Sequence, residues 1–339
     1  SFNVGFDFGA FSNRLTGSFD YFVRKTVDMV GPAPQLPLVL GIAPAIVNNA
    51  DMKSYGFEIE LSWRDRIGEV DYGVKFNLAD AQQKVVKYPN TTNAFSDWYA
   101  GKMSGEIWGY TSLGIAKTDE EMKEHLASLP NGGQNQLGNK WGAGDIMYAD
   151  INGDGKVDGG KGTLADPGDQ RIIGNSTPRY NFGLVLDASY KGFDVSIFFQ
   201  GVGKRDYAPI VGTNGAVFWG AVNNIWQSMA MEEHFDYFRP EGHPMGANLN
   251  GYCPRPDFTS NKNHQVQTRY LQDASYIRLK NLQIGYTLPK QWINKLHINR
   301  CRVYVSGDNL WTGTSLASMF DPETLAAGDW GSGKTYPLS

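Results

Sequence analysis

The stretch that decides the fold is residues 177–207, TPRYNFGLVLDASYKGFDVSIFFQGVGKRDY. Up to Tyr190 nearly every second residue is apolar or aromatic, and polar residues such as Asp187 lie between them. Successive side chains of an extended chain point to opposite faces, so this alternation predicts a strand with one apolar face. Lys191-Gly192 predicts a two-residue turn, after which the alternation resumes. The segment is therefore predicted to be a long β-hairpin, with Phe198 as an apolar residue on its polar side.

Composition limits the class of protein. The chain has 339 residues and a net charge of −4, and its 31 lysines and arginines form no stripe, so we expect no nucleic-acid partner. The 40 glycines and the 13% of aromatic residues favour strands joined by many turns. No run of about 18 apolar residues predicts a transmembrane helix. The two cysteines, Cys253 and Cys301, form neither a metal-binding pattern nor a disulfide framework.

Strands are predicted in pairs along the whole chain. Short turns join the two strands of a pair, and long segments rich in Gly, Pro, Asn and Trp separate the pairs. The pairs lie near residues 2–24, 55–79, 178–200 and 275–308, and the long segments are 25–54, 80–177, 201–274 and 309–339. Short turns that alternate with long connections are typical of outer-membrane barrels, whose long loops are extracellular. The chain opens directly in strand-like sequence, so we expect its true N-terminus to lie elsewhere.

Two local features refine this outline. In 275–287 the apolar positions change parity at Lys280-Asn281, which predicts a β-bulge. The segment Thr118-Asp119-Glu120-Glu121 is a capping box, which predicts a short helix that ends near Leu129.

A soluble β-sandwich also shows apolar alternation, so the barrel needs further support. The strands reach about ten residues, the length that crosses a bilayer at a tilt. Aromatic residues gather beside the short turns, as an interfacial girdle requires: Phe11, Trp63, Tyr190, Phe193, Tyr286 and Trp292. A connection as long as 80–177 is uncommon in a compact sandwich. We therefore expect a transmembrane antiparallel β-barrel, in which the following residues face a wet lumen: Glu58, Glu60, Asp71, Lys75, Asp187 and Asp194.

One acidic loop has the spacing of a calcium site. Oxygen-bearing side chains occupy positions 1, 3, 5 and 9 of an EF-hand-like loop, a glycine occupies position 6, and position 7 offers a backbone carbonyl. These residues are Asp150, Asn152, Asp154, Asp158, Gly155 and Lys156. Position 12 is Lys161 rather than Glu, so we expect Asp169, or failing that Asp166, to complete the set. The alternative is a solvated turn without a metal; calcium, if bound, is expected to be structural.

Tryptophans in the long segments are candidates for substrate contact, because indole rings stack on sugar rings and peptide side chains. The candidates are Trp98, Trp108, Trp141, Trp219, Trp226 and Trp311. The alternative for each is packing within the connections. The phosphate-loop pattern at Gly328–Thr335 lacks the strand before it and the helix after it, and is therefore a chance match. Nothing in the histidine pattern indicates a catalytic site.

Several motifs together resemble SusC/RagA-type TonB-dependent transporters, which are outer-membrane proteins of the Gram-negative Bacteroidetes. They are Gly56-Phe-Glu-Ile-Glu-Leu-Ser-Trp63, Gly168-Asp-Gln-Arg-Ile-Ile-Gly-Asn-Ser-Thr-Pro178, Tyr276-Ile-Arg-Leu-Lys-Asn-Leu282 and Val305-Ser-Gly-Asp-Asn-Leu310. Their order along the chain is that of the family.

The resemblance implies that residues 1–339 are the C-terminal part of a barrel of about 22 strands, whose plug is absent from this chain. It implies import of an oligosaccharide or similar nutrient without covalent chemistry. It also implies four kinds of partner: a SusD-like lipoprotein, TonB acting through the missing N-terminal portion, the remainder of the barrel as another chain, and outer-membrane lipid. Asp169 then aligns with the later acid of the family's calcium loop.

Three other functions remain open at this point. A RagA-type peptide importer fits the same architecture. A soluble, calcium-stabilised surface glycan-binding β-protein would keep the strands but perform no transport. A secreted glycosidase would require a carboxylate pair that the sequence does not single out.

Overall fold

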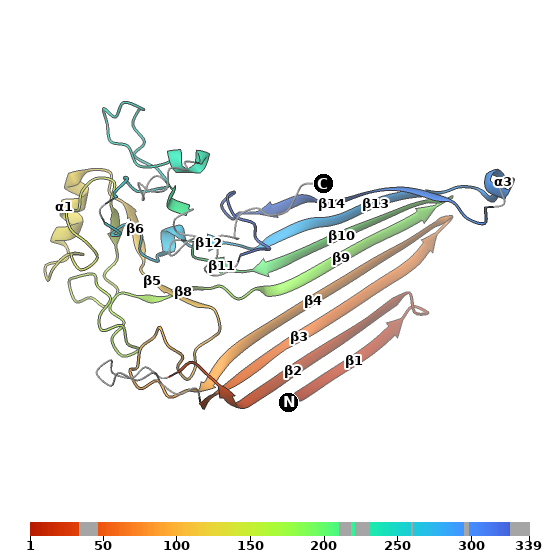
Figure 1. Cartoon of the computed structure of the whole chain (residues 1–339), viewed down its shortest axis with the longest axis horizontal. Helices are drawn as coiled ribbons and strands as arrows, with labels where there is room; N and C mark the ends of the chain where they lie inside the picture. Colours follow the sequence, from red (N-terminus) through yellow and green to blue (C-terminus); the bar gives the residue numbers. More distant parts are fainter. Residues whose placement is uncertain (34–46, 210–217, 221–230, 259, 295–297, 326–339) are drawn as a thin grey trace.

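The main element of the structure is one eight-stranded antiparallel sheet (Figure 1). The computed structural model describes residues 1–33, 47–209, 218–220, 231–258, 260–294 and 298–325. The strands of the sheet are β1 (Phe2–Ala10), β2 (Leu15–Val30), β3 (Asn48–Ile67), β4 (Val70–Lys87), β9 (Arg179–Tyr190), β10 (Phe193–Lys204), β13 (Tyr276–Thr287) and β14 (Arg302–Thr314). Each of these strands pairs with the next one along the chain, so the sheet is a meander with insertions.

The two ends of the sheet differ, and we call them the short-turn end and the long-connection end. At the short-turn end Lys191 and Gly192, both with positive φ, form the two-residue turn between β9 and β10. The turn between β13 and β14 is longer and contains the helical turn α3 (Lys290–Ile293). At the long-connection end the chain leaves the sheet for up to 91 residues, between Lys87 and Arg179.

The pairing register places one kind of side chain on each face of the sheet. Phe8, Gly17, Leu61, Phe76, Leu184, Phe199, Leu279 and Trp311 form one cross-strand row. The adjacent row, on the opposite face, is Asp7, Ser18, Glu60, Asn77, Gly183, Gln200, Arg278 and Thr312. We call these two sides the apolar face and the polar face. The six residues predicted to face the lumen all lie on the polar face.

The apolar face is uncovered. Phe6 is 59% exposed, Phe193 57% and Val305 76%, and in the described residues no second sheet is stacked on them. Along β3 the apolar face runs from Tyr55 to Ile67, about 40 Å of extended chain, which a strand tilt of about 40° reduces to about 30 Å. That height matches the hydrocarbon core of a bilayer. In the described residues no helix has the length and apolar character of a membrane span.

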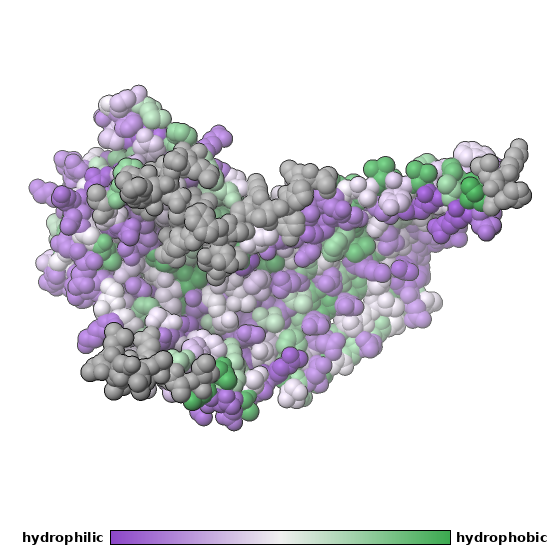
Figure 2. All heavy atoms as spheres, in the orientation of Figure 1, coloured by the Kyte–Doolittle hydropathy of each residue, from purple (hydrophilic) through white to green (hydrophobic). Residues whose placement is uncertain are grey.

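The long connections fold into a compact unit, the loop domain, defined as the described residues of 88–178, 205–275 and 315–325. Its elements are β5 (Glu106–Gly109), β6 (Ser112–Ile115), α1 (Asp119–Ala127), β7 (Ile146–Tyr148), β8 (Arg171–Asn175), β11 (Asp206–Tyr207), η3 (Glu232–Phe235), η4 (Thr268–Tyr270) and β12 (Gln272–Asp273). Thr118 caps α1, as predicted, because its hydroxyl accepts a hydrogen bond from the Glu121 amide. The buried apolar cluster, which includes Tyr148 and Tyr270, lies in this domain, and its outer surface is mainly hydrophilic (Figure 2).

The predicted ends of the strands at the long-connection end were wrong. Residues 25–30, 48–54 and 80–87 were expected in connections, but they continue β2, β3 and β4. Both faces of these extensions carry polar side chains, so the apolar alternation stops although the backbone pairing continues. β14 likewise continues to Thr314.

The predicted β-bulge is confirmed. Asn281 pairs with Phe198 and Leu279 with Phe199, so the register shifts by one residue at Lys280. On the other side β14 also carries an irregularity, because Asn309 lies at φ 53° between the paired residues Asp308 and Trp311. The bulge places Lys280 where its side chain reaches Glu323 in the loop domain.

Candidate functional site: a polar groove beneath a folded loop domain

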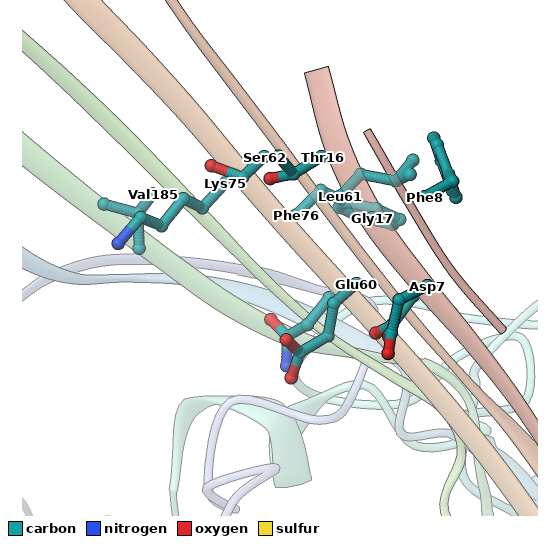
Figure 3. A pocket seen from close by; sticks show the side chains of 12 residues that line it. Asp7, Phe8, Thr16, Gly17, Glu60, Leu61, Ser62, Lys75, Phe76 and Val185 are labelled. Carbon is teal, nitrogen blue, oxygen red and sulfur yellow. The ribbon is translucent and has the colours of Figure 1, made fainter. Parts of the chain in front are cut away.

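A groove of about 520 Å³ lies on β1–β4 and β9 (Figure 3). Its polar-face residues are Asp7, Thr16, Ser18, Glu60, Ser62, Lys75, Asn77 and Val185. Their positions follow from the register, because directly opposed residues on neighbouring strands share a face. The side chains of Asp7 and Glu60 point to the same side of the sheet. The groove therefore offers carboxylates, hydroxyls, an amide and an ammonium to a polar ligand.

Toward the short-turn end the polar face becomes more strongly charged. A second groove, of about 630 Å³, is lined by Arg64, Arg66, Asp71, Asp187 and Asp194, among others. Arg302 donates to both carboxylate oxygens of Asp194, one bond being 3.0 Å long, and to Gln283 at 2.9 Å. These contacts connect β10, β13 and β14 across the eight-stranded sheet, which we call the wall.

The loop domain contains a buried carboxylate that the sequence did not single out. Asp145 is fully buried and accepts hydrogen bonds from Arg255 (2.6 and 2.8 Å), from the Lys262 ammonium (2.9 Å) and from the Asn263 amide (2.9 Å). Lys262 is itself 1% exposed and lies 4.9 Å from the centre of the Trp141 ring. Arg255, Lys262 and Asn263 each lie more than 100 residues from Asp145 in the sequence, and no local pattern predicts such a network.

Residues 316–325 are attached to the wall by ion pairs. Arg278 of β13 donates to both oxygens of Asp321 (2.9 and 3.0 Å) and to Glu323 (2.7 Å), and all three side chains are largely buried. The Lys280 ammonium lies 3.1 Å from Glu323. Leu316, Phe320 and Leu325 of the same segment belong to the apolar cluster. The segment therefore connects the polar face of the wall with the rest of the loop domain.

The acidic loop is folded by its own backbone. Asp150 accepts from the Gly153 amide at 2.6 Å and from the Gly155 amide at 2.8 Å. Asp169, fully buried, accepts from the Ile151 amide at 2.7 Å and from the Asp158 amide at 2.8 Å. Asp169 therefore joins the two ends of the loop.

A lysine is the cation of this loop in the structure. The Lys156 ammonium lies 2.5 Å from Asp158 and 3.8 Å from Asp154. The hydrogen bond with Lys156 lowers the pKa of Asp158, and the same bond raises the pKa of Lys156. The oxygen donors suit calcium in kind and in sequence spacing, but in the described residues no three Asp, Glu, His or Cys side chains are grouped as a metal site.

The candidate tryptophans do not form one surface. Trp219 is 1% exposed in the apolar cluster, and Trp141 packs against that cluster. Trp98 lies edge-on to Tyr88, and Trp108 stacks on Phe95 with ring centres 4.5 Å apart. Trp311, expected in a loop, lies instead on the apolar face of β14, while Trp226 lies outside the described residues.

The comparisons with known proteins agree with this architecture. A family model described as "TonB dependent receptor-like, beta-barrel" matches residues 1–310. The chain is 29% identical over 339 residues to TonB-dependent receptor P3 of Formosa agariphila, covering 95% of this chain and 30% of that protein. It is 20% identical over 307 residues to TonB-dependent receptor SusC of Bacteroides thetaiotaomicron, covering 86% and 26%.

Among solved structures, a chain of the RagAB peptide transporter has the same fold. It superposes with a TM-score of 0.67 at 23% identity, and the match covers 95% of this chain and 32% of that one. This chain therefore spans about a third of the length of its relatives. The match to most of its residues, together with the open polar wall and its loop domain, shows that the chain belongs to the TonB-dependent receptor-like β-barrel family, as a SusC/RagA-type member.

Proposed function

We propose that this chain forms part of the wall and the extracellular loops of a TonB-dependent outer-membrane importer in a Gram-negative bacterium of the Bacteroidetes. The observation that supports this most strongly is the pairing register, which gives one continuous sheet an uncovered apolar face toward lipid and a grooved polar face toward the lumen. The protein performs no covalent chemistry in this proposal. Passage of the nutrient is powered by TonB, through a plug formed by another part of the protein, beneath a SusD-like surface lipoprotein.

The proposed nutrient is a polar oligomer, with an oligosaccharide as our first choice. Hydroxyl, amide and carboxylate groups of the groove suit the hydroxyls of a sugar chain. The half-buried rings of Trp98 and Trp141, in the loop domain, suit stacking on the faces of sugar rings. A peptide is the second candidate, because Asp7, Glu60 and Lys75 offer charges of both signs to backbone termini and charged side chains. The structural relative named a peptide transporter shares the fold, and a likeness of this kind does not select the substrate.

Uptake by cells tests the transport proposal. The full-length protein that contains this chain is deleted in its host and restored as wild type or as Asp7→Asn/Glu60→Gln, with Asp71→Asn as the control on the same face. We expect restored growth on one class of oligomer, lost in a tonB deletion and reduced in the groove variant only. Growth that depends on neither the gene nor TonB would contradict the proposal. A protein that stays folded and monomeric without detergent would indicate the soluble glycan-binding alternative.

We further propose calcium as a structural ligand of the acidic loop, held by Asp150, Asn152, Asp154, the Lys156 carbonyl, Asp158 and Asp169. The support is the donor set and its spacing. Binding requires the Lys156 ammonium to leave Asp158, because the two cations would compete for the same oxygen atoms.

Thermal unfolding with and without calcium tests this second proposal. Asp150→Ala/Asp154→Ala should lower the unfolding temperature more in calcium than after chelation, since only part of the loss comes from the backbone hydrogen bonds of Asp150. Lys156→Gln should increase the apparent calcium affinity several-fold, since it removes the competing charge, whereas Lys161→Gln should not. Equal destabilisation of the double variant in both conditions would show that the loop is held by its backbone hydrogen bonds alone.

A further inference from the structure

Three lysines stand side by side where the apolar face ends. Lys25 of β2 pairs directly with Lys53 of β3, and Lys53 pairs directly with Lys84 of β4. Directly opposed residues share a face, and the unbroken register from Lys53 through Tyr55 to Trp63 places this lysine row on the apolar face. Neighbouring strands are about 4.8 Å apart, so the three Cα atoms span about 10 Å.

The height of the row matches the headgroup layer of a membrane. The next outward-facing row toward the short-turn end is Val23, Tyr55 and Gln82, about 7 Å along the strands, and the one after it contains Val4, Tyr21, Phe57 and the buried Asp80. Tyr21 and Val4 are exposed, as is Phe2 beside Val23. Lipid chains that cover these residues would place their headgroups at the lysine row. Tyrosine beside lysine is also the usual composition of a membrane interface.

The charges of the row are not neutralised by ion pairs in the described part of the chain. Lys25 and Lys84 are exposed, and Lys53 is half-buried with its ammonium 5.4 Å from the centre of the Tyr55 ring. None of the three lies within 4.0 Å of a described carboxylate. Like charges directly opposed on neighbouring strands repel each other, so the arrangement is favourable only when an anion approaches.

The acidic groups nearby are engaged elsewhere. Asp80, on the same face of β4, forms a two-pronged ion pair with Arg179. Asp51, one row beyond Lys53, accepts the Asp28 amide at 3.0 Å. Glu106, beside the segment that pairs with the end of β4, accepts the Met103 amide.

We propose that the lysine row binds the phosphate of an anionic lipid in the leaflet at the long-connection end. The lipid is recognised by two adjacent features: its chains contact the apolar face, and its phosphate lies among three ammonium groups. A phosphorylated headgroup suits the row because one phosphate can accept hydrogen bonds from several lysines at once. This inference goes beyond nutrient import, because it concerns the lipid-facing side of the wall.

Native mass spectrometry of the full-length protein in detergent tests the site. The protein is titrated with phosphatidylglycerol and with phosphatidylcholine of identical chains. We expect phosphatidylglycerol to bind the wild type at least about tenfold more tightly, since each lysine near an anionic surface contributes appreciably. Lys25→Gln/Lys53→Gln/Lys84→Gln should abolish the preference, and the corresponding triple Arg variant should keep it.

A matched triple variant separates the site from net charge. Lys117, Lys123 and Lys161 are exposed in the loop domain, so their replacement by Gln changes the net charge equally, far from the apolar face. A similar loss in this control, or no preference for phosphatidylglycerol in the wild type, would overturn the proposal. So would retention of the preference in the Lys25/Lys53/Lys84 variant. Displacement of phosphatidylglycerol by excess inorganic phosphate would assign the row to free phosphate instead of lipid. Intact folding of each variant is checked by its heat-dependent shift on a denaturing gel.

Discussion

At the scale of single residues, the loop domain depends on buried charges that neutralise one another. Asp145 and Lys262 are almost completely buried. The Lys262 ammonium donates to the Asp145 carboxylate and to the Lys140 carbonyl, and Asp145 also accepts from the side-chain amide of Asn263. Buried ion pairs contribute little net stability relative to apolar residues, but the loss of one partner leaves the other charge unpaired in a poorly polarisable environment.

Asp145→Asn should therefore destabilise the loop domain by about 3–5 kcal/mol, because the Lys262 ammonium would lose its carboxylate. The measurement is hydrogen exchange of the amides of β7, which follows Asp145 directly. Glu120→Gln, an exposed change of the same charge on α1, is the control and should leave these amides protected. Adding Lys262→Met to Asp145→Asn should recover part of the loss. Unchanged exchange in Asp145→Asn would show that the network does not hold β7.

His264 makes the same domain sensitive to acid. Among the described residues neither of its ring nitrogens has a hydrogen-bond partner, and its ring centre lies 4.3 Å from that of Trp219. Burial lowers the pKa of His264 to about 4, from an ordinary value near 6.5. Between these two values the unfolded state binds the additional proton, so stability is complete above about pH 6.5 and falls toward pH 4, by about 3 kcal/mol at most.

His264→Phe should remove most of this pH dependence, because Phe keeps the contact with Trp219 and carries no proton. Hydrogen exchange of the loop domain at several pH values, corrected for intrinsic rates, measures the effect. His125 provides a second, smaller contribution, since burial also lowers its pKa. An identical acid profile in wild type and His264→Phe would assign the sensitivity to other groups.

At the scale of elements, the bulge of β13 positions the attachment of residues 316–325. Lys280, the extra residue of the bulge, and Arg278, two positions before it, both reach Glu323. The parity change at Lys280-Asn281 made the bulge predictable from sequence. Its contact with Glu323 was not predictable, because the partner lies 43 residues away in a segment without periodicity.

Arg278→Met should detach residues 316–325 from the wall, because it leaves Asp321 and Glu323 buried without their main cation. We expect faster hydrogen exchange in this segment by at least about tenfold, with β13 and β14 still protected. Arg302→Met is the matched control: it breaks the ion pair with Asp194 at the other end of the same wall and should leave 316–325 unaffected. Equal protection in both variants would show that the apolar contacts of Phe320 suffice.

At the scale of the whole molecule, the wall could be predicted from the sequence, but the fold of the loop domain could not. The alternation of apolar and polar residues predicted the eight main strands, because each strand has one lipid-facing side. The strand extensions were not predicted because they lack such a side. Trp311 was predicted in a loop for a related reason, since β14 continues past residue 308, where the strand was expected to end. The loop domain is stabilised by contacts between distant segments, such as Tyr148 with Lys262, which no local pattern records.

The candidate site was predictable to a similar degree. The residues of the polar face followed from period-two alternation, whereas calcium binding by Asp150 and its neighbours stays a prediction from the spacing of the acidic loop. The packing of Trp219 inside the apolar cluster and of Trp141 against it did not follow from composition, since an indole that packs inside a domain and one that stacks on a ligand have the same local sequence requirements.

The continuation of β2, β3 and β4 past the lysine row has a consequence for access to the pore. Residues 48–52 extend about 17 Å along β3 beyond Lys53, which a strand tilt of about 40° reduces to about 13 Å above the lipid. In the proposed importer, paired strands therefore surround the entrance beyond the membrane surface, and a molecule that arrives from outside first contacts protein at that height. In the importer that we propose, a SusD-like lipoprotein that docks over the opening would need a tether long enough to reach over that height.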